Sequence, residues 1–270
     1  MGTATNRPLA VVTGASSGIG LELAKQCAEH GFDVLICAED ERIEAAAERL
    51  RSAGTAVEAV RADLATYEGN EALLRAIRAT GRPVEALLLN AGVGVNGAFV
   101  ETSLDEELRM IGLNCAAVIH AAKRIVPDMV AHGRGRVLIT SSIAATTPAP
   151  YLAVYAATKA FDLSFAEALR EELKDTGVTV TALQPGATDT EFFERAEMQD
   201  TKVGQARKDD PAEVAKQGFE AMMKGKDSVI AASVKSKLQG LANELLPETT
   251  KARVQAGQNK PGSGKAGEKA

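Results

Sequence analysis

Residues 10–21 read AVVTGASSGIGL, and this stretch decides the fold of the chain. Its first three residues form a short apolar run of the kind found in strands that are buried on both faces. Gly14, Gly18 and Gly20 follow, and apolar residues then recur at helical spacing. A glycine turn brings backbone N–H groups close to a pyrophosphate, and the N-terminus of the next helix points its positive end at the same anion. The spacing is not Gly-x-Gly-x-x-Gly, so the stretch by itself also fits an ordinary strand-to-helix loop.

Composition narrows the class of protein. With 270 residues, of which 45% are hydrophobic and 25% charged, the chain suits one globular domain with a full core. The formal charge of −5 argues against nucleic-acid binding, because no basic field offsets the repulsion of phosphates. The opening residues MGTATNRP lack the charged and apolar regions of a signal peptide, and no apolar stretch reads as a membrane span. We therefore expect a cytoplasmic protein without a nucleic-acid or membrane partner.

Cysteine and histidine usage argues against a metal site. Cys27, Cys37 and Cys115 lie far apart, the chain has only three histidines, and no Cys-x-x-Cys or Cys/His spacing occurs. We expect buried free thiols, as is usual in a reducing compartment.

Strand-like apolar runs alternate with helical patterns along most of the chain. Strands are predicted at Leu9–Thr13, Asp33–Ala38, Ala56–Arg61, Ala86–Asn90, Arg136–Thr140, Val178–Gln184 and Ser228–Ala231. Helices are predicted between them, at Ile19–His30, Glu41–Ala53, Glu68–Thr80, Leu104–Ala131, Val154–Lys174 and Pro211–Lys224. This alternation indicates βαβ units, and hence a doubly wound α/β domain whose mostly parallel seven-stranded sheet is covered by helices on both faces. We assign this single domain to residues 1–247.

Two of the predicted helices carry more apolar residues than one core face needs. In the helix over 104–131, Ala116, Ala117 and Ala121 lie beside an apolar seam that runs from Leu104 to Met129. The helix over 154–174 likewise carries additional apolar residues at Ala156, Ala160 and Leu163. A second apolar face favours an interface in a homodimer or homotetramer, although a wider contact with the protein's own sheet explains it equally well.

The end of the chain changes in character. Residues 248–270 contain almost nothing to bury, so a flexible, weakly basic tail is predicted there. Just before it, four leucines have the spacing of a short amphipathic helix that packs on the domain: Leu238, Leu241, Leu245 and Leu246.

A tyrosine and a lysine four residues apart supply the chemistry. Tyr155 and Lys159 fall within a predicted helix, where this spacing puts them on one face, and Ser142 follows the preceding strand. A phenol holds its proton until roughly pH 10, and a lysine cation one turn away favours the phenolate. A serine hydroxyl opposite can hydrogen-bond a carbonyl oxygen and hold it near the phenol. A lone Tyr-xxx-Lys pair is usually an exposed helix face, but here it stands in a chain that opens with a nucleotide turn.

Together these motifs resemble those of the short-chain dehydrogenase/reductase family, between about Pro8 and Ser233. The turn Thr13–Gly20 is similar to the cofactor turn of that family, and Asn90-Ala91-Gly92 is similar to the motif that ends its fourth strand. The resemblance implies a Rossmann-like fold that binds NAD(P). It implies cofactor contacts at Gly14, Ser16, Ser17, Gly18, Ile19, Gly20, Asp63, Leu64, Asn90, Ala91, Gly92, Tyr155, Lys159, Pro185, Gly186 and Thr188.

The resemblance also implies a catalytic set. Tyr155 would exchange a proton with the substrate oxygen, Ser142 would orient that oxygen, and Lys159 would lower the tyrosine pKa and bond the nicotinamide ribose. Asn114, within the long helix, would anchor a water chain that resupplies protons. The hydride transfer itself belongs to the cofactor.

The choice between the two dinucleotides depends on the end of the second strand. Glu39 lies about twenty residues after the glycine turn, where an acid bonds the adenosine ribose. In many NADP-dependent family members an arginine stands at that position, whereas Glu39 would repel a 2′-phosphate. The sequence departs equally from the usual NAD pattern of the family, in which the acid falls at the Ala38 position. We favour NAD over NADP on the charge of Glu39, although Arg42 is near enough in sequence to reach a phosphate.

Other polar residues near the motifs are assigned to the surface. Asp162 and Glu167 are predicted to be solvated helix-face charges. His120 and His132 are predicted to be surface or packing residues. The segment Thr188–Asp210 stands where the family carries a substrate lid, and its aromatic residues suggest an apolar side to the pocket.

The sequence therefore predicts an oxidoreductase that interconverts a secondary alcohol and a ketone, or reduces an aldehyde. A 3-oxoacyl-thioester reductase is the alternative within enzymes, and no basic cluster for an acidic acyl carrier is visible. A non-catalytic dinucleotide-sensing regulator is the alternative of another class, although a sensor has no use for a proton relay.

Overall fold

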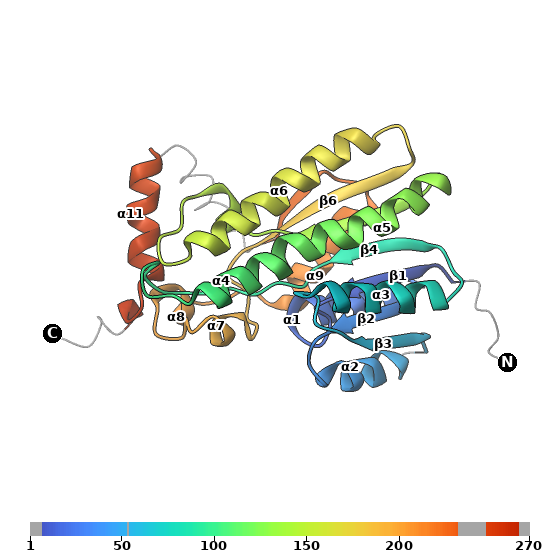
Figure 1. Cartoon of the computed structure of the whole chain (residues 1–270), viewed down its shortest axis with the longest axis horizontal. Helices are drawn as coiled ribbons and strands as arrows, with labels where there is room; N and C mark the ends of the chain where they lie inside the picture. The colour runs from blue at the N-terminus through green and yellow to red at the C-terminus, as the bar shows by residue number, and fades with distance from the viewer. Residues whose placement is uncertain (1–6, 53, 232–246, 265–270) are drawn as a thin grey trace.

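Seven parallel strands form one sheet in the order β3-β2-β1-β4-β5-β6-β7 (Figure 1). The computed structural model describes residues 7–52, 54–231 and 247–264. The strands are β1 (Leu9–Thr13), β2 (Asp33–Ala38), β3 (Val57–Arg61), β4 (Val84–Leu89), β5 (Gly135–Thr140), β6 (Val178–Pro185) and β7 (Ser228–Ala231). The chain runs outward from β1 to β3, then returns to the other side of β1 at β4. Ligands bind at such a reversal, beyond the carboxyl ends of the strands.

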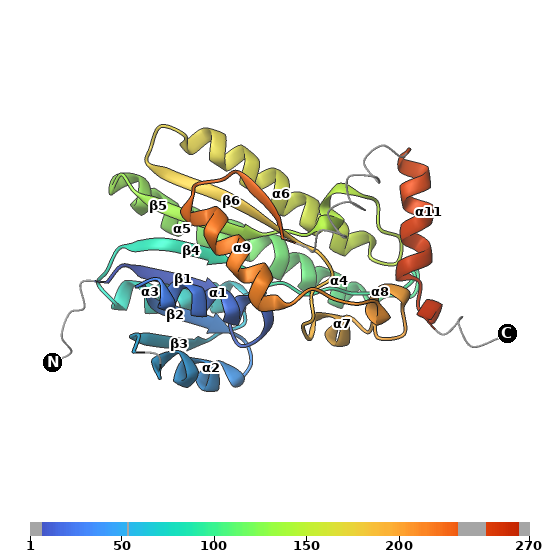
Figure 2. The ribbon, with the colours of Figure 1, turned by 180° about the vertical axis from the view of Figure 1, so that it is seen from behind.

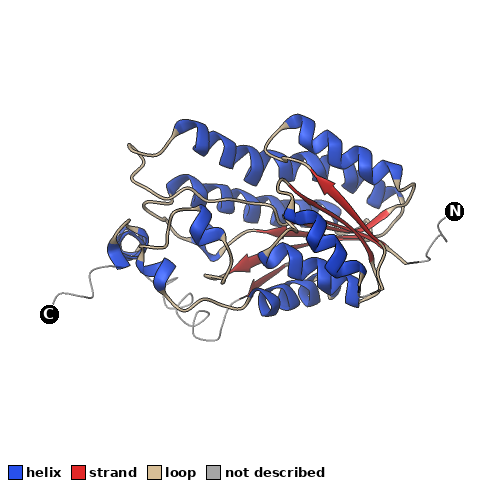
Figure 3. Ribbon diagram, turned by 90° about the horizontal axis from the view of Figure 1, so that it is seen from below, coloured by secondary structure: helices blue, strands red, loops and turns tan. Residues whose placement is uncertain are grey.

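Helices cover both faces of the sheet (Figures 2 and 3). One face carries α1 (Gly18–Glu29), α2 (Arg42–Arg51) and α9 (Pro211–Met223), and the other carries α3 (Tyr67–Ala79), α5 (Ala117–Ala131) and α6 (Ala153–Leu173). Side chains alternate along each strand, so Leu9 and Val11 join the core under α3 and α5, while Ala10 and Val12 join the core under α1 and α9. The predicted fold class is confirmed, and the predicted strands and shorter helices lie where the sequence put them.

The long predicted helix is interrupted by a π-turn. It consists of α4 (Leu104–Ile111), η1 (Gly112–Ala116) and α5. The apolar seam changes surroundings at this turn: Leu104, Leu108 and Ile111 are exposed on α4, which extends beyond the sheet (Figure 1), whereas the α5 members of the seam are buried. Ala117 and Ala121 pack in the protein's own core. This part of the second face therefore contacts the sheet.

The predicted flexible tail is wrong for residues 248–264. Glu248–Asn259 forms the helix α11, which lies beside α8 (Lys202–Gln205) at one end of the molecule (Figure 1). Polar contacts hold it in place: Asn259 Nδ2 donates to the Pro150 carbonyl at 3.3 Å, and Asn96 Nδ2 donates to the Asn259 carbonyl at 3.0 Å. A search for apolar burial misses a helix that is anchored by amides. The four leucines of the predicted preceding helix lie outside the described residues.

Among the helices that the structure describes, none combines the length and the apolar character needed to cross a membrane.

Candidate active site

The glycine turn between β1 and α1 depends on its glycines. Gly14 has φ of +67°, where a side chain is strained. Gly20 has no such φ, but a Cβ built on it would lie 2.1 Å from the Gly14 carbonyl oxygen, so only glycine fits. Thr13 Oγ1 accepts hydrogen bonds from the N–H of Asn90 at 3.0 Å and of Ala91 at 3.1 Å. The motif after β4 is thereby tied to the turn before α1.

A cavity of about 1300 Å³ runs from this turn along the carboxyl ends of the strands. It is larger than the roughly 300–1,000 Å³ of a small-molecule pocket, as a site that holds a dinucleotide together with a substrate requires. Every predicted cofactor residue lines it, and so do Ser142, Tyr155 and Lys159. The glycines leave its wall open to an anion at the N-terminus of α1, so the residues present fit a dinucleotide.

Tyr155 and Lys159 stand one turn apart in α6. Lys159 is buried, and its Nζ donates to the Thr140 carbonyl at 2.9 Å and to Asp162 Oδ2 at 3.0 Å. Burial raises the pKa of Tyr155, while the Lys159 charge and the Ser142 hydroxyl lower it. The lysine thus acts in the predicted direction, but burial outweighs it in this structure and the net shift of the tyrosine pKa is upward.

Asn114 lies in the π-turn and is fully buried. Its Oδ1 accepts from the Val93 N–H, and its Nδ2 donates to the Val93 carbonyl and to Thr158 Oγ1, each at 3.0 Å. Of the four predicted catalytic residues it alone does not line the cavity. π-turns are rare and often occur at functional sites, and this one directs Asn114 toward the β4–α4 loop.

The prediction that Asp162 is solvated is wrong. Its side chain is 1% exposed and pairs with Lys159. Asp162 follows Lys159 by three residues and therefore shares its helix face, which was the signal in the sequence. Glu167 is exposed as predicted. His120 pairs with Glu71 at 2.9 Å and His132 is exposed, as expected of surface residues.

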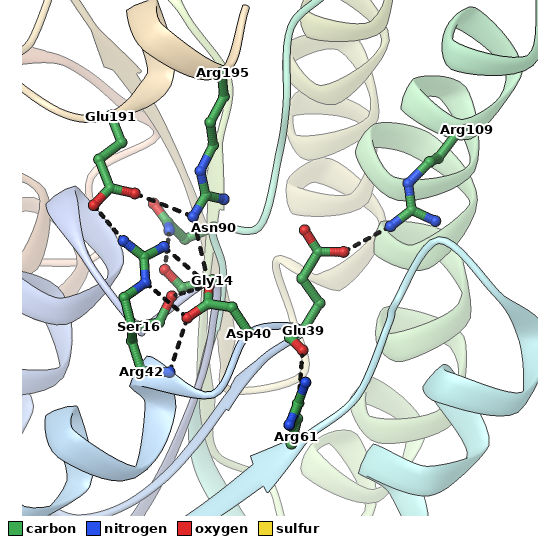
Figure 4. Close-up of polar contacts among 10 residues, drawn as sticks. All are labelled: Gly14, Ser16, Glu39, Asp40, Arg42, Arg61, Asn90, Arg109, Glu191 and Arg195. Atoms are coloured by element: carbon green, nitrogen blue, oxygen red, sulfur yellow. Dashed lines mark hydrogen bonds and ion pairs between the residues drawn. The ribbon is translucent and has the colours of Figure 1, made fainter.

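Charged residues surround the end of the cavity at β2 (Figure 4). Asp40 accepts from Ser16 at 2.9 Å and from Arg42 Nε at 3.0 Å, and Arg42 also pairs with Glu191. These hydrogen bonds from Arg42 are the main cause that lowers the pKa of Asp40 to about 2.

Two arginines complete this charged end. Arg195 contacts Asp40 at 3.5 Å and Glu191 at 3.1 Å. Arg109 of α4, which the sequence analysis did not select, holds Glu39 at 2.6 Å and Asp63 at 2.7 Å.

A family model described as short chain dehydrogenase matches residues 8–201. The chain belongs to the short-chain dehydrogenase family.

Three relatives illustrate the similarity of this short-chain dehydrogenase to known proteins. Glycine betaine reductase ATRR of Emericella nidulans is 36% identical over 186 residues, which are 68% of this chain but only 15% of that protein. A putative ketoacyl reductase of Streptomyces coelicolor is 33% identical over 67% of this chain and 71% of its own. The solved structure of a short-chain dehydrogenase from Sphingobium yanoikuyae in complex with NADPH is 32% identical, covers 88% of this chain and 93% of its own, and superposes with a TM-score of 0.78.

The segment Thr188–Asp210 of this short-chain dehydrogenase contributes to the lining of the cavity. It contains α7 (Phe192–Arg195) and α8, and its buried Phe193 and Met198 pack with Leu152 near the start of α6. The Phe192 ring lies 5.2 Å from the ring of Tyr155, so the segment contacts the predicted proton donor directly.

The cysteines lie apart from this site's polar groups, except for Cys115 in the π-turn. Cys27 and Cys37 are buried free thiols, and burial raises the pKa of each to about 12. Cys115 is only partly buried, so the prediction holds fully for two of the three. Among the described residues, no group of three His, Cys, Asp or Glu side chains is arranged to hold a metal ion.

Proposed function

We propose that this NAD(P)-dependent oxidoreductase interconverts a secondary alcohol and a ketone, or reduces an aldehyde, with Tyr155 as its general acid and base. The observation that carries the proposal is that Tyr155, Ser142 and Lys159 line one cavity together with the glycine turn. Bound NAD(P) supplies or accepts the hydride. The protein's own groups hold the substrate oxygen and move one proton to or from it.

Each of these side chains has one task. Tyr155 donates its phenolic proton to the substrate oxygen in reduction, and as a phenolate it takes that proton back in oxidation. Ser142 donates to the same oxygen, which fixes it within reach of the phenol. Lys159 favours the phenolate by its charge and has a third N–H left for a cofactor hydroxyl, because two are held by Thr140 and Asp162.

Replacement of the phenol tests this function. Tyr155→Phe keeps the ring packed against Phe192 and removes only the proton donor. We expect kcat to fall at least about a hundredfold, while the affinity for the dinucleotide is retained. Steady-state kinetics with ketones and aldehydes measure the first quantity, and fluorescence titration with the reduced cofactor measures the second. Near-parental turnover would rule out the role of the tyrosine.

We propose NAD as the preferred cofactor. Glu39 and Asp40 are acids at the end of β2, and both arginines that face Asp40 are also paired with Glu191. A 2′-phosphate would have to separate Arg42 from Asp40 before it gained that arginine. The structure of the Sphingobium yanoikuyae relative contains NADPH, so NADP is the alternative that the experiment must distinguish from NAD. KM values for NADH and NADPH decide the matter, and a strong preference for NADPH would overturn this proposal.

A second candidate substrate is a 3-oxoacyl thioester. The similarity to the putative ketoacyl reductase of Streptomyces coelicolor favours it. Activity on acyl thioesters that exceeds activity on simple ketones would select it. The alternative of a regulator without turnover is set aside, because the relatives that match most of this chain are oxidoreductases.

We also propose that the protein acts in the cytoplasm as a homodimer or homotetramer. Leu104 and Leu108 on α4, and Phe161 on α6, leave apolar surface exposed. Exposed apolar surface of this kind favours association with a second copy. Light scattering that gives the mass of a monomer at micromolar concentration would contradict the proposed oligomeric state.

A further inference from the structure

A buried carboxylate stands behind the catalytic lysine. Asp162 Oδ2 lies 3.0 Å from Lys159 Nζ, and the two side chains are 1% and 5% exposed. Asp162 Oδ1 is buried and has no hydrogen-bond partner among the described residues. Burying a carboxylate with one unsatisfied oxygen opposes folding, and apolar side chains in place of both members of the pair would avoid that cost. The site therefore keeps a group that packing alone disfavours.

Few titratable groups face this pair. Tyr155 lies on the same helix, and Cys115 lies in the π-turn η1 that packs against it. Among the described residues, the electrostatic interactions of the Lys159–Asp162 pair are with these two side chains. From β5 the lysine meets only an uncharged group, the Thr140 carbonyl. Burial lowers the pKa of Lys159, but the Asp162 charge and then Tyr155 more than offset it, so the net shift of the lysine pKa is upward. Burial raises the pKa of Asp162, and the Lys159 charge opposes that shift. Asp162 and Lys159 act on Tyr155 in opposite directions.

We propose that Asp162 is a positioning residue that fixes the Lys159 ammonium beside Thr140 and offsets part of the positive charge presented to Tyr155. This inference rests on the proposed function, in which Tyr155 carries the proton. Asp162 does not line the cavity, so it acts on Tyr155 by holding Lys159 and by its own charge, and not by contact with cofactor or substrate. The three side chains form one electrostatic unit, and its protonation equilibrium sets the pH at which the tyrosine works.

Direct titration of the phenol tests the unit without turnover. The chain has three tyrosines and no tryptophan, so phenolate absorbance has little background. The difference between each protein and its Tyr155→Phe counterpart isolates the titration of Tyr155. Asp162→Asn keeps the shape of the side chain and removes its charge. The positive charge of Lys159 is then no longer offset by Asp162 and favours the Tyr155 phenolate more strongly. We expect the pKa of Tyr155 to fall by about one unit or more. The pH at which kcat/KM for alcohol oxidation reaches half of its maximum should move down by the same amount.

The matched control is an exposed pair on the same helix. Glu171 pairs with Lys174 at the same spacing of three residues, although here the acid precedes the lysine, and both side chains are exposed. Glu171→Gln should leave the titration of Tyr155 unchanged. Asp162→Ser, which removes the charge and keeps a hydroxyl oxygen on this face of the helix, gives the same expected shift if the asparagine variant does not fold. An unchanged or higher pKa of Tyr155 in the folded Asp162 variants would overturn the inference, as would an equal shift in Glu171→Gln. Full turnover in Tyr155→Phe would instead overturn the proposed function, and the phenolate titration would still be readable.

Discussion

Single side chains at this site are held by backbone groups of other elements. Lys159 donates to the Thr140 carbonyl. Asn114 accepts from the N–H of Val93 and donates to the carbonyl of Val93. The two side chains converge at Gly92, since a Cβ built there would lie 3.3 Å from both Lys159 Nζ and Asn114 Oδ1. The glycine of the Asn-Ala-Gly motif thus leaves room for Lys159 Nζ at the wall of the cavity and for Asn114 behind that wall.

At the residue scale we predict that Asn114 stabilises the fold. Asn114→Ala leaves the N–H and the carbonyl of Val93, and the Thr158 hydroxyl, without the amide that now bonds them. A buried polar group without a partner costs about 1–3 kcal/mol. Because Val93 is only partly buried, we expect the free energy of unfolding to fall by about 1–2 kcal/mol. Urea denaturation measures the change. Ser164→Ala, at an exposed position of α6, serves as the control with a loss near zero. Equal losses in the two variants would contradict this role.

How far the sequence predicts a residue depends on what surrounds it. The motif residues could be selected from the sequence because their types and spacing carry chemistry that is independent of packing, and their roles stay predictions. Asp162 and Arg109 could not be selected in this way, because an acid three residues after a lysine, or an arginine on a helix, is usually solvated. Their roles depend on which face of α6 is buried and on where α4 meets the loop after β2, and these are set by tertiary structure.

Among the elements, ion pairs join the 188–210 segment to the loop after β2 and to the start of α2. Glu191, the residue before α7, pairs with Arg42 at the start of α2, and Arg195 at the end of α7 contacts Asp40. The segment thus spans the cavity from the loop after β2 to the ring of Tyr155. The sequence predicted a lid here from family position, and the lid role stays a prediction.

At the element scale we predict that loss of one carboxylate loosens this segment. Glu191→Gln removes the charge that both Arg42 and Arg195 contact, and leaves Asp40 as their remaining partner. Because these groups are about 40% exposed, the change in global stability should be within about 1 kcal/mol. Limited proteolysis should cut within 188–210 faster than in the parent, and bound cofactor with substrate should slow the cut. Glu48→Gln, an exposed acid of α2, is the control. Equal cleavage in all three proteins would contradict the idea.

Elements were predicted well where burial is apolar and periodic. The seven strands are short apolar runs whose length and alternation with helices leave few other assignments. The helix α11 escaped prediction because its contacts with the β4–α4 loop and with Pro150 are made by amides, which carry no periodic signal.

At the scale of the whole molecule the cavity has two ends made by different parts of the chain. The glycine turn and the loops after β2 and β3 form one end, and they come from the first third of the sequence. The other end is formed by the 188–210 segment, by the loop before α6, and by Val254, Gln255 and Gln258 of α11. Residues far apart in the sequence therefore meet at the predicted substrate end. The nucleotide end is built mainly from the first third of the chain, and Arg109, Glu191 and Arg195 reach it from later elements.

We predict that removal of α11 weakens binding of the substrate and leaves binding of the cofactor nearly unchanged. A chain that stops at Pro247 lacks the α11 side chains that line the substrate end, but keeps every residue of the glycine turn and of the charged network. We expect KM for the carbonyl substrate to rise about tenfold or more, which corresponds to about 1.4 kcal/mol of lost binding, and the cofactor Kd to stay within about twofold. Circular dichroism shows whether the shortened chain folds, and Asn259→Ala, which weakens only the anchor to Pro150, should change KM in the same direction by less. An equal loss of affinity for the cofactor and the substrate would mean that α11 supports the whole fold rather than one end of the cavity.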